Sequence, residues 1–389
     1  MISFSFVVIE ESADFTKLLI NKMTTIALYF FILCLIIQIL YWIIIFSRVA
    51  FAKLQPVTSS NIPISVIICG YNEGENFRQF LPKILEQDYP NFEVIVVNDR
   101  STDNSTKILA SFENQYKHLK VIHLTDFDRQ QRGKKFALTQ GLKAAKHDIV
   151  LLTDADCYPT SRNWIKTMVS GLGQQKTMGI AYVPFDKRPT FLNKFLRYDK
   201  IYIAIQYLSF ALSGMPYMGA GANLIYRKEL FFKSNGFKKH AHVASGDDDL
   251  FVSEVANKEN LAIVLHADSF IYCEPKDTFQ QFYHQKSRHI STSWHYKFHH
   301  QILLGVLAQS HFWLYIFGVI ALFNPVYQSF TIFAVILRWF IMVIIFRKIA
   351  HRFDEKDMTI WLPIMDILYV AYYLVFALPL MKGNNGRWE

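Results

Sequence analysis

The sequence predicts an α/β domain built on a mostly parallel, doubly wound sheet, with transmembrane helices before and after it. Between about residues 60 and 190, apolar β-branched runs alternate with helical stretches, which is typical of a parallel sheet covered by helices. Outside this region lie long stretches with few charges, which help to raise the hydrophobic share of the 389 residues to 52%. A chain of this length can hold one large or two modest domains besides such stretches.

The first long apolar stretch, Ile26–Phe46, contains no charged residue and is long enough to cross a hydrocarbon core of roughly 30 Å. Acidic residues precede it and no small-residue cleavage site follows, so we expect a retained anchor rather than a signal peptide. Three more apolar stretches follow at about 302–323, 327–346 and 360–381. Arg338 and Asp366 interrupt two of these, and a charged residue at mid-span usually faces protein rather than lipid.

Basic residues near the spans predict the orientation of the chain. They follow the first span and separate the third from the fourth, and they are Arg48, Lys53, Arg347, Lys348, Arg352 and Lys356. By the positive-inside rule, the segment between the first and second spans is cytosolic, as in an integral protein of a bacterial inner membrane. We assign the net charge of +9 to the membrane surface, and expect no nucleic-acid partner because the aromatic residues lie mainly in the apolar spans.

The cysteines indicate a reducing compartment. Cys34, Cys69, Cys157 and Cys273 are scattered along the chain and form no CxxC pair. This spacing predicts neither a zinc site nor a disulfide framework, which suits a cytosolic domain.

After a linker at about 58–61, the elements of the soluble part follow from apolar runs and turn signals. The expected strands, each a continuous apolar run, are Ile64–Cys69, Phe92–Val97, Lys120–Leu124 and Ile149–Thr153. The expected helices are about Asn76–Glu86, one capped by Ser101 or Asp103, and Gly133–Ala145. Gly70 ends the first strand, and Tyr89-Pro90-Asn91 forms a turn before the second.

Polar side chains stand where three of these strands end. Tyr71-Asn72-Glu73 follows the first strand, Asn98-Asp99 the second, and Asp154 and Asp156 the last. Doubly wound sheets bind ligands beyond the carboxyl ends of their strands, so we expect these groups to converge. Two carboxylates separated by one residue can hold a hard divalent cation that also takes phosphate oxygens. An isolated Asp-x-Asp is more often a solvated turn, and the convergence of three strand ends favours the site.

Three motifs carry a resemblance to a known family. Val66–Glu73 (VIICGYNE), Val96–Asp103 (VVNDRSTD) and Asp154-Ala155-Asp156 resemble, in order and spacing, glycosyltransferase family 2 with its GT-A fold. The resemblance covers roughly residues 62–295 and extends to the membrane-bound cellulose, chitin and hyaluronan synthases. It implies an inverting transfer from a nucleotide-diphosphate sugar, usually a UDP-sugar, with Mg²⁺ or Mn²⁺.

The apolar stretches and the resemblance together divide the chain into parts. These are a tail at 1–24, an anchor at 25–48, a nucleotide-sugar-binding half at 60–190, an acceptor half with amphipathic membrane-surface helices at 191–300, and C-terminal transmembrane helices at 301–382.

The same resemblance gives roles to the residues at the strand ends. Asp156 would coordinate the cation, with Asp154 contacting the ribose or the metal shell. Asp99 would accept a hydrogen bond from a uracil N–H and Tyr71 would pack on the base, while Glu73 is counted with the donor-binding residues. Without the resemblance, Asp99 could simply cap the next helix, and Tyr71 could be ordinary packing.

Two further motifs would contact the donor phosphates. Lys134, in Gly133–Leu138 (GKKFAL), could approach them near a helix start, although a solvated lysine fits equally well. Gln285 and Arg288 match the Gln-x-x-Arg-Trp motif of the polymerising relatives, and Arg288 could clamp the diphosphate bidentately. His289 replaces the tryptophan that would stack on the acceptor sugar, which puts processive polymerisation in doubt.

An inverting transfer needs a general base on the acceptor side. Gly246–Leu250 (GDDDL) departs from the family motif Gly/Thr-Glu-Asp-x-Asp-Leu. Anchoring the match on the glycine makes Asp248 the base, which we favour, whereas anchoring on the leucine makes it Asp247. Carboxylates that cap a helix are the structural alternative. Gly219–Asn223 resembles the family's acceptor loop, or else forms an ordinary turn.

These observations favour a membrane-bound inverting glycosyltransferase that moves a sugar from a UDP-sugar to a lipid-linked or membrane-proximal acceptor. The alternative within enzymes is a processive polysaccharide synthase of the poly-N-acetylglucosamine or cellulose type, for which four spans are few. A catalytically inactive scaffold that binds sugar nucleotides is the alternative from another class. The expected partners are the nucleotide-sugar donor, a lipid or glycan acceptor, and the membrane.

Overall fold

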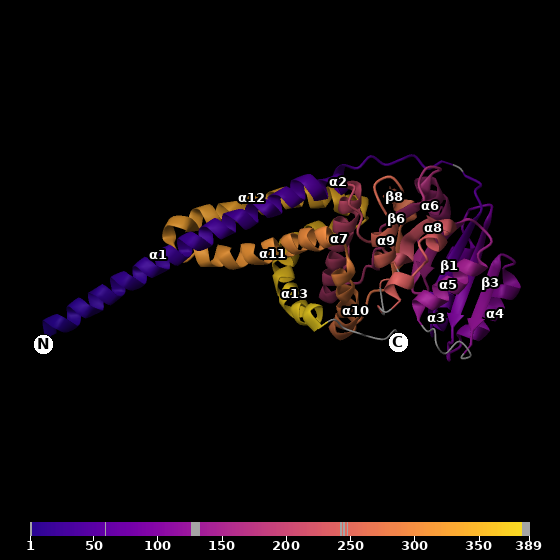
Figure 1. Ribbon diagram of the computed structural model, residues 1–389, viewed down its shortest axis with the longest axis horizontal. Coiled ribbons are helices and arrows are strands. Elements are labelled where there is room, and N and C mark those ends of the chain that lie inside the picture. The colour runs from indigo at the N-terminus through magenta and orange to yellow at the C-terminus, as the bar shows by residue number, and fades with distance from the viewer. Residues whose placement is uncertain are drawn as a thin grey trace.

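The computed structural model describes residues 2–58, 60–125, 133–241, 243, 246 and 248–382. It has two parts, a group of long helices and an α/β domain, with shorter helices standing between them (Figure 1). Both parts were predicted from the sequence.

The α/β domain is built on a seven-stranded sheet with strand order β3-β2-β1-β4-β7-β6-β8. The strands are β1 (Ile64–Gly70), β2 (Phe92–Asp99), β3 (Leu119–Leu124), β4 (Ile149–Asp154), β6 (Met178–Ala181), β7 (Leu224–Arg227) and β8 (Leu261–Val264). Strands β3, β2, β1 and β4 are parallel, as predicted. The apolar runs of β2, β1 and β4 are covered on both faces, whereas the edge strand β3 is partly exposed. Strand β7 is antiparallel to both of its neighbours, which makes the sheet mixed.

The helices of this domain follow the strands closely. They are α3 (Gly74–Leu85), α4 (Ser105–Gln115), α5 (Lys134–Ala144), α6 (Trp164–Leu172), α8 (Lys228–Lys233) and α9 (Asp249–Val255). Helix α5 packs on β1 and β2, and Gly141 makes that close approach possible. A Cβ at this position would lie 2.6 Å from the side chain of Ile67, so a larger residue would push the helix off the sheet.

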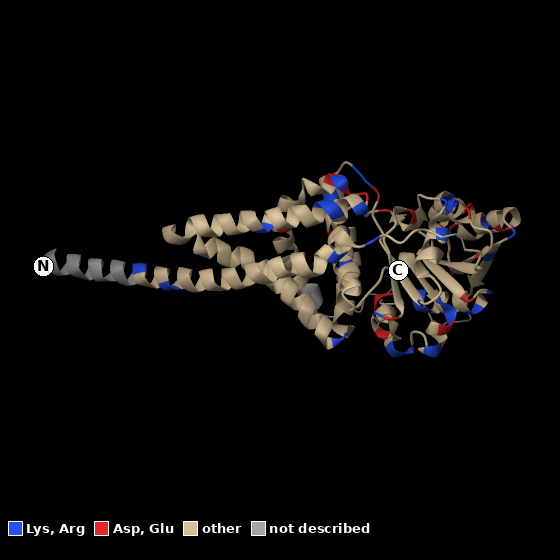
Figure 2. Cartoon of the chain, turned by 90° about the horizontal axis from the view of Figure 1, so that it is seen from above, with Lys and Arg blue, Asp and Glu red and all other residues tan. Residues whose placement is uncertain are grey.

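The long helices are α1 (Ile2–Leu40), α11 (Phe298–Ala321), α12 (Pro325–Arg352) and α13 (Leu362–Lys382). A π-helical segment, Tyr41–Phe46, continues α1 into α2 (Ser47–Phe51). Three described segments are long and apolar enough to cross a membrane, namely Lys17–Phe51, α11 and α12. Charged residues gather on the α/β domain and at its junction with these helices, which are themselves almost free of charge (Figure 2). Their outer faces carry large apolar side chains such as Phe333 and Phe340, both 63% exposed.

The two charged residues predicted within the spans face each other. Arg338 of α12 binds both carboxylate oxygens of Asp366 in α13, at 2.5 and 3.1 Å. Its guanidinium also donates to Gln38 Oε1 of α1 at 3.0 Å, and His311 Nε2 of α11 lies 3.0 Å from Asp366. All four side chains are buried, so one polar cluster joins the four helices and the charges of Arg338 and Asp366 are not exposed.

Replacing Arg338 by methionine is expected to lower the free energy of unfolding in detergent by about 3 kcal/mol, because Asp366 is then left buried without its partner. The double variant Arg338→Met/Asp366→Leu is expected to lose less than this single variant, because no unpaired carboxylate remains. Denaturant titration of both proteins measures the difference. A double variant less stable than Arg338→Met would contradict the assignment.

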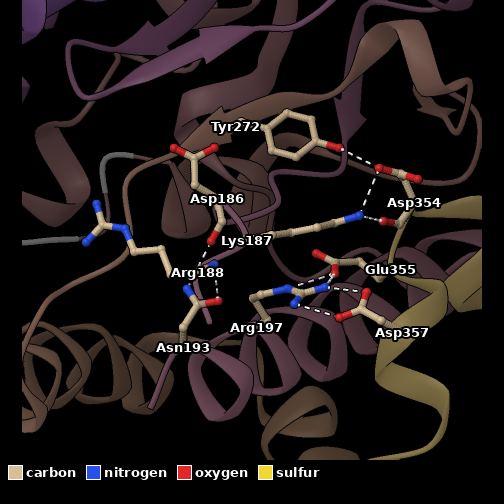
Figure 3. Close-up of polar contacts among 9 residues, drawn as sticks. All are labelled: Asp186, Lys187, Arg188, Asn193, Arg197, Tyr272, Asp354, Glu355 and Asp357. Atoms are coloured by element: carbon tan, nitrogen blue, oxygen red, sulfur yellow. Dashed lines mark hydrogen bonds and ion pairs between the residues drawn. The ribbon is translucent and has the colours of Figure 1, made fainter. Parts of the chain in front are cut away.

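The junction between the two parts is held by ion pairs. Helix α7 (Phe191–Leu212) carries Arg197, whose guanidinium binds Glu355 and Asp357 in the loop between α12 and α13 (Figure 3). Glu355 is fully buried, and Lys187 before α7 reaches Asp354 of the same loop at 3.0 Å. The loop is therefore fixed to the helix that underlies the α/β domain.

Candidate active site

The predicted site lies at the carboxyl ends of β1, β2 and β4. In the sheet register, Cys69 of β1 pairs with Asp154 of β4 and Gly70 pairs with Asn98 of β2, so the loops after these strands are neighbours. Asn72 ties two of the loops together, since its N–H donates to Ser101 Oγ at 2.9 Å and its side-chain oxygen accepts from Thr102 N at 2.8 Å. The parallel half of the sheet thus brings the motifs together.

Three carboxylates gather at this edge: Glu73, Asp154 and Asp156. Burial raises the pKa of Glu73 to about 7, with Asn76 opposing the rise and the charges of Asp156 and Asp154 adding to it. Burial, followed by the charge of Asp154, likewise raises the pKa of Asp156. Neighbouring carboxylates therefore make ionisation of Glu73 and Asp156 harder, which favours a cation at this position.

Lys134 is not a solvated lysine. It is the first residue of α5, and its ammonium lies 2.7 Å from a carboxylate oxygen of Asp154. Gly133 before it adopts a φ of +97°, which side chains rarely tolerate, and this turn starts the helix over the site. Lys134 therefore belongs to the group around the carboxylates.

Asp99 and Tyr71 occupy the base side of the predicted site. Asp99, the last residue of β2, is 3% exposed and forms an ion pair with Arg100. It does not cap the next helix, because the residue before α4 is Asn104. Tyr71 follows β1, and its side chain is 38% exposed. Base recognition by these two residues stays a prediction.

Asp248 lines the same pocket as Asp154. This small pocket is lined by Ile67, Cys69, Lys134, Leu138, Leu152, Thr153, Asp154, Gly221 and Asp248. One carboxylate oxygen of Asp248 caps α9, as the capping alternative expects, and the other accepts from Gly221 N at 2.7 Å. A Cβ on Gly221 would lie 2.9 Å from Asp248, so this position of the predicted acceptor loop has no room for a side chain.

The other two aspartates of the triplet differ from Asp248. Asp249 is buried and accepts hydrogen bonds from Thr292 Oγ1 and from Tyr296 Oη, the latter at 2.8 Å, so it anchors the segment after helix α10 (Phe279–Ser291). Asp247, the alternative base, lies outside the described residues.

Helix α10, which carries Gln285 and Arg288, stands between the α/β domain and the long helices (Figure 1). A capping box of Thr278 and Gln281 starts the helix, and both predicted residues are half-buried on it. Desolvation by neighbouring residues, followed by the charges of Arg288, Lys286, Lys200 and Lys134, lowers the pKa of the next residue, His289, to about 3, although part of its surface is exposed. His289 is therefore neutral and faces the same cations as the carboxylates do.

Two lysines of the site were missed in the sequence. Lys276, before α10, and Lys200, on α7, both act on Asp156 through their charges. Neither belongs to a motif, and each is brought to the site by a turn or helix far along the chain. Only their tertiary position reveals them.

The expectation of no disulfide was wrong. Cys157 and Cys273 are bonded, 116 residues apart, across the antiparallel pair of β5 (Cys157–Pro159) and β9 (Ile271–Cys273). Their spacing in the sequence does not predict this bond, because β5 and β9 are brought together only by the tertiary fold. The bond fixes the chain directly after Asp156. Cys34 and Cys69 are buried and lie outside this disulfide.

The donor set suits a hard divalent cation. Carboxylate oxygens are the ligands that Mg²⁺ and Mn²⁺ prefer, and Asp154 and Asp156 offer them beside the ammonium of Lys134. These two residues would hold the ion, which would supply neutralising charge for a departing diphosphate.

Comparison with known proteins agrees with this site. Residues 65–232 match the family model described as glycosyl transferase family 2, and residues 149–377, more than half of the chain, match the model described as glycosyl transferase family group 2. The matches span the α/β domain and reach into the long helices.

Curated relatives match over shorter stretches. The chain is 33% identical over 112 residues to the uncharacterized glycosyltransferase YibD of Escherichia coli, covering 28% of this chain and 31% of that protein. It is 32% identical over 126 residues to the poly-beta-1,6-N-acetyl-D-glucosamine synthase of Staphylococcus epidermidis, covering 30% of this chain and 29% of that protein. The matched segment thus spans under a third of either relative.

One solved structure matches over nearly the whole chain. It is a mannosyltransferase from Pyrobaculum calidifontis in complex with GDP-Man and Mn²⁺, with a TM-score of 0.56, 18% identity, and coverage of 93% of this chain and 97% of that one. At this identity the likeness shows the fold, including the arrangement of the helices beside the domain.

Proposed function

Because this chain belongs to the family 2 glycosyltransferases, we propose that it is an inverting enzyme that moves a sugar from a UDP-sugar to a lipid-linked or membrane-proximal acceptor. One observation carries the proposal. Asp154 and Asp248 line one pocket, with the metal side formed by β4 and the acceptor side by α9. Helices α7 and α10 stand between this pocket and the long helices, so an acceptor in the membrane is close to it (Figure 1).

The roles follow from these positions. Asp156 and Asp154 would hold Mg²⁺ or Mn²⁺, while Asp99 and Tyr71 would bind the uracil base. Asp248 would take the proton of an acceptor hydroxyl as its oxygen bonds to the anomeric carbon, and UDP would leave with the electron pair of the broken bond. Glu73, Lys134, Gln285 and Arg288 would complete the donor site.

Orientation follows from the basic residues at the junction. Arg347, Lys348 and Arg352 end α12 on the side of the α/β domain. The positive-inside rule then places this domain in the cytosol, where sugar nucleotides are made, and the helices in the inner membrane.

Processive synthesis is the second candidate. The similarity to a poly-beta-1,6-N-acetyl-D-glucosamine synthase favours it. Two features of the chain favour single transfer instead: His289 stands where the synthases carry tryptophan, and only three described segments are long and apolar enough to span a membrane. Single transfer is therefore our first candidate.

UDP release by the purified protein, measured with a panel of UDP-sugars and membrane lipids, tests the proposal. We expect release with at least one donor, dependent on Mg²⁺ or Mn²⁺ and abolished by EDTA. Mass spectrometry of the product then separates addition of one sugar from a ladder of lengths. UDP binding without release under every condition would favour an inactive scaffold.

A further inference from the structure

Lys200 lies on the membrane side of the metal carboxylates. It belongs to α7, which stands between the long helices and the sheet (Figure 1). Its ammonium lies over the ring of Phe185, 4.7 Å from the centroid. Phe185 bridges to Cys273, whose sulfur is bonded to Cys157, the residue after Asp156. The ammonium is therefore next to the loop that carries the metal carboxylates.

Among the described residues, Lys200 forms no ion pair. The carboxylate of its neighbour Asp199 is bound by other groups, since it accepts hydrogen bonds from Lys286 Nζ at 2.6 Å and from Tyr369 Oη at 2.6 Å. Burial and the charge of Lys286 lower the pKa of Lys200, while Asp156, Asp199 and Asp154 oppose this. Asp154 is paired with Lys134 and Asp199 with Lys286, and a half-buried ammonium beside such paired carboxylates can stabilise an added anion.

The side chains around Lys200 suit an anion better than a sugar ring. His289 and Arg288 of α10 share this side of the cleft, with His289 close enough to feel the charge of Lys200. No stacking aromatic stands at position 289. Once a divalent cation occupies Asp154 and Asp156, the positive charge of Lys200 is left for a group that enters from the membrane.

We infer that Lys200 forms an anion subsite that binds the phosphate of a lipid-linked acceptor. The inference rests on the proposed transferase function and names the class of acceptor. The phosphate either links the acceptor sugar to its lipid or itself supplies the attacking oxygen. The need for Asp248 distinguishes these two cases. A sugar hydroxyl needs a general base, whereas a phosphate oxygen is already charged at neutral pH and does not.

Binding of a long-chain prenyl phosphate and of the matching prenyl alcohol, measured in nanodiscs without donor, tests the subsite. We expect the wild-type protein to prefer the phosphate. Lys200→Ala should weaken phosphate binding by about 10- to 100-fold, as for loss of a charged hydrogen bond, and Lys200→Arg should restore most of it. Lys194→Ala is the matched control, since Lys194 lies on the same helix over Trp361 at 4.0 Å from its centroid.

Three results would overturn the inference: equal binding of phosphate and alcohol, an equal loss in Lys194→Ala, or an equal loss of UDP affinity in Lys200→Ala. The last result would place Lys200 in the donor site. These outcomes are independent of the proposed function, because binding is measured without sugar transfer. If the protein releases UDP but Lys200→Ala still binds the lipid phosphate normally, the anion subsite is wrong and the proposed transferase function stands. Turnover of Asp248→Asn, measured with each lipid as acceptor, then identifies the attacking oxygen. A loss of turnover indicates a hydroxyl, and unchanged turnover indicates a phosphate oxygen.

Discussion

Replacing Asp156 by asparagine is expected to reduce UDP release by at least about 10³-fold, which corresponds to about 4 kcal/mol of lost transition-state stabilisation. The amide keeps the size of the side chain but removes the charge that would hold the cation. The remaining carboxylate, Asp154, is already paired with Lys134 at 2.7 Å and cannot compensate. The affinity for Mn²⁺ should fall together with turnover, and both can be measured on the purified protein.

Asp148→Asn is the matched control for this variant. Asp148 directly precedes the same strand, β4, at the opposite end, and its side chain is exposed. It should leave turnover and Mn²⁺ affinity unchanged, because surface substitutions of this kind have small effects. Wild-type turnover in Asp156→Asn would end the assignment of the metal site.

The fold was predictable where local pattern and tertiary position agree. Strands β1, β2 and β4 are buried on both faces, so each appears in the sequence as an unbroken apolar run. Strand β7 was not predicted, because four residues, Leu224–Arg227, carry no periodic signal and their antiparallel pairing depends on a distant segment.

The site was predictable where its residues lie in motifs at strand ends. Asp154, Asp156, Glu73 and Lys134 were all named from the sequence, and the structure gathers them. Lys200 was seen only as one of several charges on an apolar helix. Its relation to Asp156 arises from the packing of α7 beneath the sheet, which no local pattern encodes.

The structure also links the long helices to α10, which carries two residues of the candidate site. Asp199 of α7 joins Lys286 of α10 to Tyr369 of α13, so the helix that carries Gln285 and Arg288 is held by a buried contact to the C-terminal helix. Such a contact fixes the orientation of α10 relative to the long helices. The position of Gln285 and Arg288 therefore depends on the packing of α10 against α7 and α13.

Replacing Asp248 by asparagine is expected to reduce turnover with a hydroxyl acceptor by about 10³-fold, within the range for loss of a general base. The affinity for UDP with Mn²⁺ should stay within about twofold, because the base acts on the acceptor proton and binds no part of the donor. In the wild-type structure Asp248 accepts a hydrogen bond from Gly221 N at 2.7 Å, and the amide oxygen of asparagine can still accept it. The loop that carries Gly221 should therefore keep its position.

Asp249→Asn separates a structural aspartate from the catalytic one. Asp249 accepts from Thr292 and Tyr296 in a buried position, so an amide there should lower the free energy of unfolding by about 1–3 kcal/mol. Its turnover per folded molecule should fall far less than that of Asp248→Asn. If Asp248→Asn kept most of its turnover while Asp247→Asn lost it, the base would be Asp247, since the two readings of the GDDDL motif predict opposite results for this pair. A joint loss of turnover and UDP affinity in Asp248→Asn would instead assign that residue to the donor site.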